Sequence, residues 1–344
     1  MKNTKKIISR KRNEHVSLYV TLIAVFILMG VLNGSRFFAF KNLTAMMYQM
    51  PMIGLLAIGM LIAELTGGIN LSIVSLANFN GIIIYMFLSA FTKGNIAAAN
   101  FGIVIVVMAI SAVICCLVGA LNGAMIAYLK IPALLVTLGT MTLLQGLSLI
   151  FTKGYTLSGF PNSLTFFGTG SVLKIPMSII MFAVIVFISH IILDKTVFGR
   201  QLYMTGANPV AAKYSNVDIT KVYILEYIFS AFFSFSASIV MIGQMNSVKA
   251  NYYESYVLIA VLASFLGGVD PNGGFGKIGG TVLAAIILQI ISTGLNLLRL
   301  NPFMVTAMWG AIIILVSFGR EFVAKFKIAW ESRNLKSAKM EENK

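Results

Sequence analysis

The sequence contains very little charge for its length. Only 11% of its 344 residues are charged, whereas 58% are apolar, and the mean hydropathy is +0.90. Soluble domains carry about 25% charged residues, so this composition excludes a large soluble domain. At about 20 apolar residues per crossing, the apolar content suffices for on the order of ten transmembrane helices. We therefore predict an all-α integral membrane protein, a polytopic bundle of about ten helices.

Cysteine and histidine are also scarce. Cys115 and Cys116 are adjacent in an apolar run, where neighbours point to different faces of a helix, so neither a disulfide framework nor a metal site is indicated. His15 lies in a basic segment and His190 near the end of another apolar run, so no histidine cluster exists for zinc or nucleophilic catalysis. We expect no catalytic residue, no metal ligand and no cofactor on this chain, and hence no enzyme.

Acidic residues inside the apolar segments are rarer still. Glu64 ends the second segment, and Glu226 lies one turn into the seventh, where we expect it to reach the membrane interface. A carboxylate at the centre of a membrane helix costs about 2.5 to 3.5 kcal/mol, and we favour a capping or interhelical role for both. Proton-driven transporters carry relays of buried acids or histidines, which this sequence lacks. Its energy source is therefore expected to lie elsewhere.

Ten apolar segments follow one another along the chain. The first comes after six basic residues, and its length and the lack of a small-residue cleavage site favour an uncleaved helix over a signal peptide. Only the eighth is short enough to be re-entrant. The predicted segments are 16–32, 43–64, 69–91, 101–129, 132–152, 175–193, 222–243, 254–268, 278–298 and 302–319.

The basic residues predict the orientation. There are 26 Lys and Arg against 11 Asp and Glu, a net charge of +15. With both termini cytoplasmic, 19 basic residues fall inside and 7 outside, as the positive-inside rule requires, whereas a re-entrant eighth segment would export the seven of the C-terminal tail. The excess of basic residues is explained by the orientation of the chain in the membrane, and we expect no nucleic-acid partner. We predict a cytoplasmic segment at residues 1–15, a transmembrane domain at 16–319 with a cytoplasmic loop at 194–221, and a charged cytoplasmic tail at 320–344.

Neutral polar and aromatic side chains occupy the predicted membrane interior. They can hydrogen-bond helices to one another, or they can line a path for a neutral polyhydroxy solute, which needs donors, acceptors and apolar ring contacts but no charged partner. The candidates for such a path are Asn70, Ser72, Asn78, Gln145, Phe232 and Phe235.

Two connections stand out. Residues 267–280 hold seven glycines, but neither the dinucleotide fingerprint nor a phosphate-binding loop fits their context, so we predict a tight turn. In the loop 194–221, Asn208 is a good N-cap and Pro209 a good first helical residue, which predicts a short helix through Tyr214. We expect Gly199 and Gly206 to interrupt regular structure in the loop, so that this helix projects as a compact knob.

Four segments together resemble the permeases of ribose-type sugar importers of the ATP-binding-cassette class. They are Gly199 to Ala212, Thr66 to Ser72, Ile131 to Thr140 and Gly267 to Gly276, and the resemblance covers about residues 45 to 318. It departs from the family at Asn70, where aspartate is common, at Ser72-Ile-Val-Ser75, and at the insert Asp270-Pro-Asn272. These departures concern the identity of the solute.

The resemblance implies a multi-pass protein of a bacterial inner membrane that moves a pentose or hexose inward by alternating access. Implied partners are a second permease, identical or related, cytoplasmic ATPase subunits that bind ATP and magnesium, an extracytoplasmic sugar-binding protein, and membrane lipid. The carried-over ATPase-coupling residues are Arg200, Gly206, Asn208, Pro209, Ala211, Ala212, Lys213 and Tyr214. Open alternatives are a nucleoside, a furanose-like signalling molecule or a branched-chain amino acid as solute, and, from other classes, an ion-coupled transporter or a membrane enzyme.

Overall fold

The computed structural model describes residues 2–301 and 303–316, with side chains from Ser17 onward. The predicted tail at 320–344, the last residues of the tenth segment and the basic side chains of residues 1–15 lie outside the described part. The chain divides into two units, Met1–Leu298 and Arg299–Lys344. The described residues are mostly helical.

Seven helices are long and apolar enough to cross a membrane. Three shorter apolar helices accompany them: Ser17–Asn33 within α1 (Lys2–Asn33), α12 (Tyr256–Leu266) and Phe303–Val316. Each of the ten predicted segments overlaps one of these helices. The seven long helices are α3 (Phe40–Glu64), α4 (Ile73–Phe91), α5 (Phe101–Leu129), α6 (Ala133–Thr152), α8 (Met177–Lys195), α11 (Ile219–Met245) and α13 (Ile278–Leu297).

Short elements connect these helices. Strands β1 (Leu157–Ser158) and β4 (Ser247–Val248) pair antiparallel with Leu157 opposite Val248, and β2 (Ser171–Val172) pairs with β3 (Ile175–Pro176). The remaining connections are α2 (Ser35–Phe38), the 3-10 turn η1 (Ile96–Ala98), α7 (Asn162–Thr169), α9 (Val197–Ala207) and α10 (Pro209–Tyr214).

The unit Met1–Leu298 has a buried centre. Helix α11 packs on α3, α4, α5 and α7, and α3 also contacts α12 and α13. In α3, α4, α11 and α13, 67–72% of the apolar stretch is buried, whereas in α5, α6 and α8 only 22–28% is. The four mostly buried helices therefore form the inside of this unit. Each of the three mostly exposed helices leaves one side for lipid or another protein.

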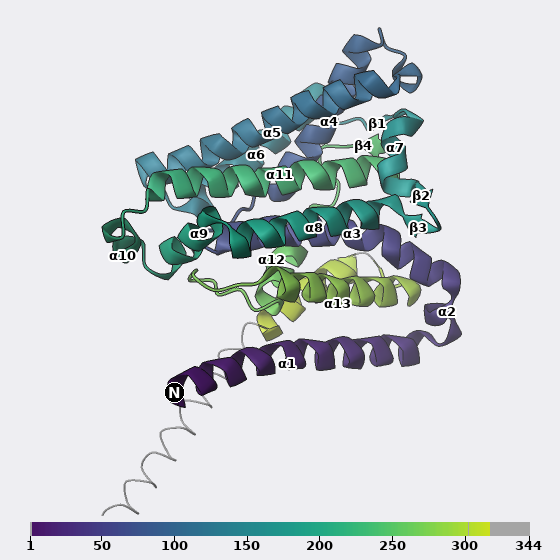
Figure 1. Ribbon diagram of the computed structural model, residues 1–344. Helices are drawn as coiled ribbons and strands as arrows, with labels where there is room; N and C mark the ends of the chain where they lie inside the picture. Colours follow the sequence, from purple (N-terminus) through teal and green to yellow (C-terminus); the bar gives the residue numbers. More distant parts are fainter. Residues whose placement is uncertain (1, 302, 317–344) are drawn as a thin grey trace, which may run out of the picture. The chain divides into compact units, whose positions relative to one another are not determined.

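Helix α11 defines two ends of this unit (Figure 1). It begins next to α10 and finishes next to β4, and its 27 residues span about 40 Å at about 1.5 Å per residue. We call these the α10 end and the β4 end. Gly274 donates its backbone N–H to the Leu65 carbonyl beside Ala207, which places the loop after α12 at the α10 end. The chain between β4 and this loop therefore runs from one end to the other.

That passage is made by a broken segment instead of a continuous helix. Helix α12 has 11 residues and spans only about 16 Å, roughly half of the about 30 Å hydrocarbon core. The rest of the distance is covered by the chain before α12, in which residues 250–255 form turns. An exposed non-helical backbone is too costly in lipid, and here it is shielded because it lies against α4.

Candidate functional site

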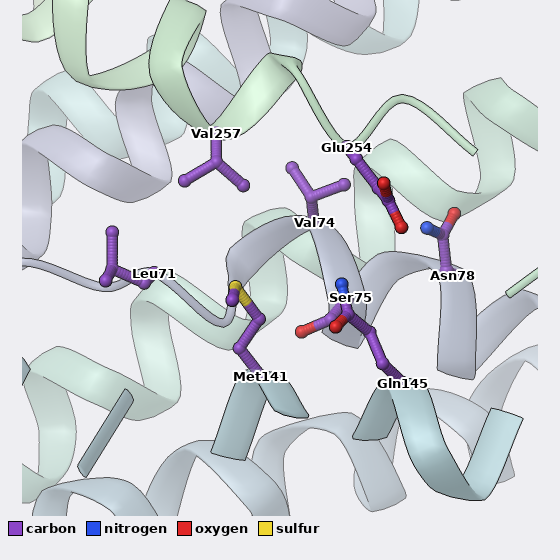
Figure 2. Close-up of a pocket in the computed structure, with 8 residues that line it drawn as sticks. All are labelled: Leu71, Val74, Ser75, Asn78, Met141, Gln145, Glu254 and Val257. Carbon is purple, nitrogen blue, oxygen red and sulfur yellow. The ribbon is translucent and has the colours of Figure 1, made fainter. Parts of the chain in front are cut away.

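A cavity of about 350 Å³ lies between the first turns of α4 and α12. Helix α6 closes it from a third side (Figure 2). Both α4 and α12 start inside the protein after a non-helical stretch, so their first turns can approach one another. The residues that line the cavity are Leu71, Val74, Ser75, Asn78, Met141, Gln145, Glu254 and Val257.

The α4 side of the cavity is held by hydrogen bonds from the stretch between α3 and α4. Asn70 is buried, donates its amide to the Ser230 hydroxyl at 2.9 Å, and accepts from the Ser72 hydroxyl at 2.7 Å. Thr137 of α6 donates its hydroxyl to the Ile69 carbonyl at 2.8 Å. The Asn70 Oδ1 also accepts the Ser72 N–H at 3.1 Å. Since this bond and that of Thr137 satisfy non-helical backbone inside the protein, they fix where α4 begins.

The α12 side is held by Asn78. This residue is only 1% exposed, and its side-chain amide donates to the backbone carbonyls of Tyr252 at 2.8 Å and Ala250 at 3.3 Å. The bonds keep the turns before α12 against α4. Tyr253 follows with a φ of 56°, a left-handed conformation that is uncommon for a bulky residue. This sharp change of direction brings Glu254 to the cavity.

The cavity combines polar groups with apolar walls. The Asn78 Oδ1 is buried without a hydrogen-bond partner among the described residues. Ser75 donates its hydroxyl to the Ser72 carbonyl at 2.9 Å and keeps free acceptor capacity. Among the lining residues Glu254 carries the only charge. This lining can bind hydroxyl groups and contact the carbon face of a small solute.

The predicted pathway residues separate into three groups. Asn78 and Gln145 line the cavity, whereas Asn70 and Ser72 support the chain that enters it. Phe232 and Phe235 lie on α11 with ring centroids 6.1 Å apart and do not line it. Sequence reasoning missed Glu254, whose signal was an acidic residue directly before a short apolar run. It also missed Leu71, Val74, Met141 and Val257.

A second candidate site is the knob at the α10 end. As predicted, Asn208 caps a short helix: its Oδ1 accepts the Ala211 N–H at 3.0 Å, and Pro209 is the first helical residue. Ala212 is buried and anchors α10. Around it α10 exposes Val210, Tyr214, Ala211 and Lys213, with Tyr214 90% exposed. The knob thus presents a small mixed apolar and basic surface.

The residues that flank the knob also have defined environments. Arg200 is exposed on α9. Asp218 caps α11 by accepting the Lys221 N–H at 3.2 Å, and this backbone hydrogen bond lowers the pKa of its carboxyl below the ordinary value. The side chains of Asp218 and Lys221 also lie 3.2 Å apart as an exposed ion pair, which contributes little to stability.

The expectation that Gly199 and Gly206 punctuate the loop is wrong. Both lie inside α9, a helix that the sequence pattern did not predict. A Cβ at Gly206 would lie 1.8 Å from the Leu65 carbonyl oxygen, and one at Gly199 would lie 2.0 Å from that of Leu193. These glycines are needed because other backbone passes directly against the helix. The turn predicted for 267–280 is confirmed only as far as Lys277, because α13 begins at Ile278. Gly268 and Gly273 in this turn have positive φ.

Hydrogen bonds tie the neighbouring helices α9 and α11 to the loops after α12 and after α3. Tyr203 of α9 donates its hydroxyl to the Gly276 carbonyl at 2.8 Å, and burial raises its pKa to about 12. Thr66 donates its hydroxyl to the Glu226 carboxyl at 2.7 Å. The expectation that Glu226 reaches the membrane interface is therefore wrong, because the side chain is fully buried. The hydrogen bond instead joins α11 to the turn after α3, which is a structural role but not a bond between two helices.

Among the described residues, no group of three or more His, Cys, Asp or Glu could hold a metal ion. Cys115 is buried and donates its thiol to the Ala231 carbonyl at 3.2 Å.

The chain is similar to known permease components of transport systems. The family model "Branched-chain amino acid transport system / permease component" matches residues 42–317. The ribose import permease protein RbsC of Bacillus subtilis (strain 168) is 31% identical over 307 residues, which are 86% of this chain and 89% of that protein. RbsC of Escherichia coli (strain K12) is 28% identical over 301 residues, 86% and 91% of the two chains. The autoinducer 2 import system permease protein LsrD of Klebsiella pneumoniae is 29% identical over 316 residues, 90% and 92%. No solved structure matches the chain.

Proposed function

Since the chain belongs to the family of branched-chain amino acid transport system permease components, we propose that it is the membrane-spanning subunit of an ATP-binding-cassette importer. Its solute is a neutral monosaccharide, a pentose or a hexose, which it moves inward across a bacterial inner membrane. The observation that carries this proposal is the cavity at the first turns of α4 and α12. It offers amide, hydroxyl and carboxylate groups between apolar walls and carries no positive charge.

The topology we propose is ten crossings with both ends in the cytoplasm. It is supported by the passage from β4 to the α10 end, which α12 and the turns before it make together. Helix α1 packs along α13 with Met29 against Gly294, so its first residues lie toward the α10 end. The α10 end is then the cytoplasmic side, which agrees with the basic residues of loop 194–221.

The proposed partners follow from this orientation. A cytoplasmic ATPase pair docks on α10, and ATP and magnesium are bound there instead of by this chain. A sugar-binding protein delivers the solute at the β4 end. A second permease, identical or related, covers part of the exposed faces of α5, α6 and α8, and lipid covers the rest. Closure of the ATPases moves α9 and α10, and the cavity changes the side from which it is accessible.

Two alternative solutes fare differently. A furanose-like signalling molecule remains a second candidate, because LsrD is 29% identical over 90% of this chain and its name refers to autoinducer 2 import. A branched-chain amino acid is disfavoured. The cavity has no cationic side chain to pair with the carboxylate of an amino acid and carries a carboxylate of its own at the start of α12, which leaves only the first turn of α4 to bind that group.

The docking surface can be tested by changing α10. We predict that Ala211→Arg, which places a bulky charge on the exposed face, reduces co-purification of the ATPase from detergent by at least about tenfold, as expected for a hot-spot residue. Tyr155→Arg is the matched control, because Tyr155 is 72% exposed near β1 at the opposite end. Undiminished ATPase binding by Ala211→Arg would contradict the coupling assignment.

The transport function itself is tested in proteoliposomes that contain the complete complex. We expect uptake of radiolabelled ribose, or of autoinducer 2 for the second candidate, to require ATP and the binding protein. Uptake by this chain alone, driven by an ion gradient, would overturn the proposal.

A further inference from the structure

We propose that Glu254 is a specificity-determining residue of the cavity. Its carboxylate accepts hydrogen bonds from two neighbouring hydroxyl groups of a neutral polyol and keeps anionic solutes out. This inference rests on the proposed importer function, because it takes the cavity as part of the solute pathway.

The position of Glu254 is unusual for an acidic residue in this chain. It sits directly before α12, after the left-handed Tyr253, and its backbone carbonyl accepts the Val257 N–H at 3.3 Å. The side chain is exposed to the cavity opening and forms no hydrogen bond or ion pair with any residue that the structure describes. Glu226 differs, because its carboxyl is buried and bonded to Thr66.

Other polar groups lie close to Glu254. Figure 2 shows the Glu254 carboxylate directed toward the amide of Asn78, and Gln145 reaching from α6 toward Ser75. The amide nitrogen of Asn78 is engaged by two backbone carbonyls, but its Oδ1 is buried and unbonded within the described residues. Gln145 likewise forms no hydrogen bond with the described chain. The lining of the cavity therefore includes one carboxylate, the amide of Gln145, and no cationic side chain.

This chemistry favours one class of solute. A carboxylate has two oxygens that accept only, so adjacent hydroxyl groups of one sugar can donate to both. The amide of Gln145 supplies a donor and an acceptor for a third hydroxyl, while Val74, Met141 and Val257 contact the C–H face of the ring. A phosphate or carboxylate would instead meet the like charge of Glu254 inside the cavity and be repelled by it.

The proposal that Glu254 repels anions can be tested with a cysteine reporter at Met141, which lines the cavity. In the full chain carrying Met141→Cys, we expect a cationic methanethiosulfonate to react about tenfold faster than an anionic one of equal size, and Glu254→Gln to bring the ratio close to one. Glu254→Asp keeps the charge and should keep the preference. Cys115 and Cys116 set the background, measured on the chain without the reporter. An unchanged ratio in Glu254→Gln would overturn the proposal.

The proposal that Glu254 binds two neighbouring hydroxyl groups is tested with ribose as the probe. Ribose should slow labelling of the Met141→Cys reporter, 2-deoxyribose should protect at least about fivefold less because it lacks one of two adjacent hydroxyls, and ribose 5-phosphate should not protect. Protection that is equal for ribose and its phosphate, or stronger for a protonated amine than for ribose, would contradict the assignment. A complex that imports ribose with ATP while Glu254→Gln leaves protection intact would refute this inference alone. Absence of ATP-dependent uptake would refute the importer instead.

Discussion

The inner and outer helices of this protein differ in a way that reverses the rule for soluble proteins. The most apolar of the seven long helices is α5, yet only 22% of its apolar stretch is buried, whereas α11 is among the less apolar and is 72% buried. Buried serines of α11, among them Ser230, Ser234 and Ser238, have no counterpart on the exposed side of α5. In a bilayer, apolar side chains are as well solvated by lipid as by protein, so hydrophobicity does not select the inside.

Small residues and hydrogen bonds between helices determine instead which helices lie inside the protein. Gly119 and Gly123 of α5 lie against the backbone of α11, where a Cβ would come within 2.5 Å of the Tyr227 carbonyl oxygen or 2.6 Å of the Ile224 Cα. Asn80 of α4 donates to the Ser238 hydroxyl at 2.7 Å. Helices that must approach closely therefore carry glycine and serine, and the faces turned to lipid carry leucine, isoleucine and valine.

The largest effect on stability is expected from a side chain added where α5 lies directly against the backbone of α11. Gly119→Ala should lower the free energy of unfolding by about 1 to 3 kcal/mol, because the new methyl group meets backbone that cannot turn away. Gly139→Ala is the matched control on α6, since nothing lies within 4 Å of its Cβ position. Thermal unfolding of the purified chain in detergent measures both. Equal destabilisation by the two substitutions would break the distinction between inner and outer faces.

An intermediate effect is expected at the buried pair of Thr66 and Glu226. Interhelical hydrogen bonds in membranes contribute about 0.6 kcal/mol on average and at most about 1.7. We predict a coupling energy in this range from the double-mutant cycle of Thr66→Val and Glu226→Leu, with each single variant less stable than the wild type. Additive effects would show that the 2.7 Å contact contributes nothing. Glu226→Gln, which keeps an acceptor, should lose least.

The smallest effect is expected at the exposed N-cap of α11. The Lys221 N–H lowers the pKa of Asp218 in the folded state, so its stabilisation is present above the unfolded pKa and is lost as the pH falls through the lowered value. Asp218→Ala should therefore be slightly less stable than the wild type at neutral pH and equal to it in acid. Asp218→Asn keeps the acceptor and should show no such pH dependence. A difference that grows in acid would contradict this sign.

Local features were predictable from the sequence, and long-range contacts were not. The helix at Pro209–Tyr214 followed from Asn208 and Pro209 alone, because capping involves residues three positions apart. The apolar segments followed from composition along the chain. The role of Gly206 could not be read in this way, since it depends on backbone at Leu65, 141 positions earlier.

The candidate cavity was predictable only in part for the same reason. Asn78 and Gln145 were recognisable as polar residues within apolar segments. Glu254 was not, because its place depends on the turns that Asn78 holds against α4 and on the direction change at Tyr253. A periodic pattern shows which residues are apolar, but it does not show where a crossing is broken.

The measurement that tests the account most directly asks whether α10 controls access to the cavity. In the reconstituted complex carrying Met141→Cys, labelling by an impermeant reagent from outside should change several-fold when ATP and magnesium are added. The same change should be lost when Ala211→Arg uncouples the ATPase, and it should persist with Tyr155→Arg. A reactivity that is the same with and without ATP, in a complex that hydrolyses ATP, would contradict the proposal that the knob and the cavity belong to one transport cycle.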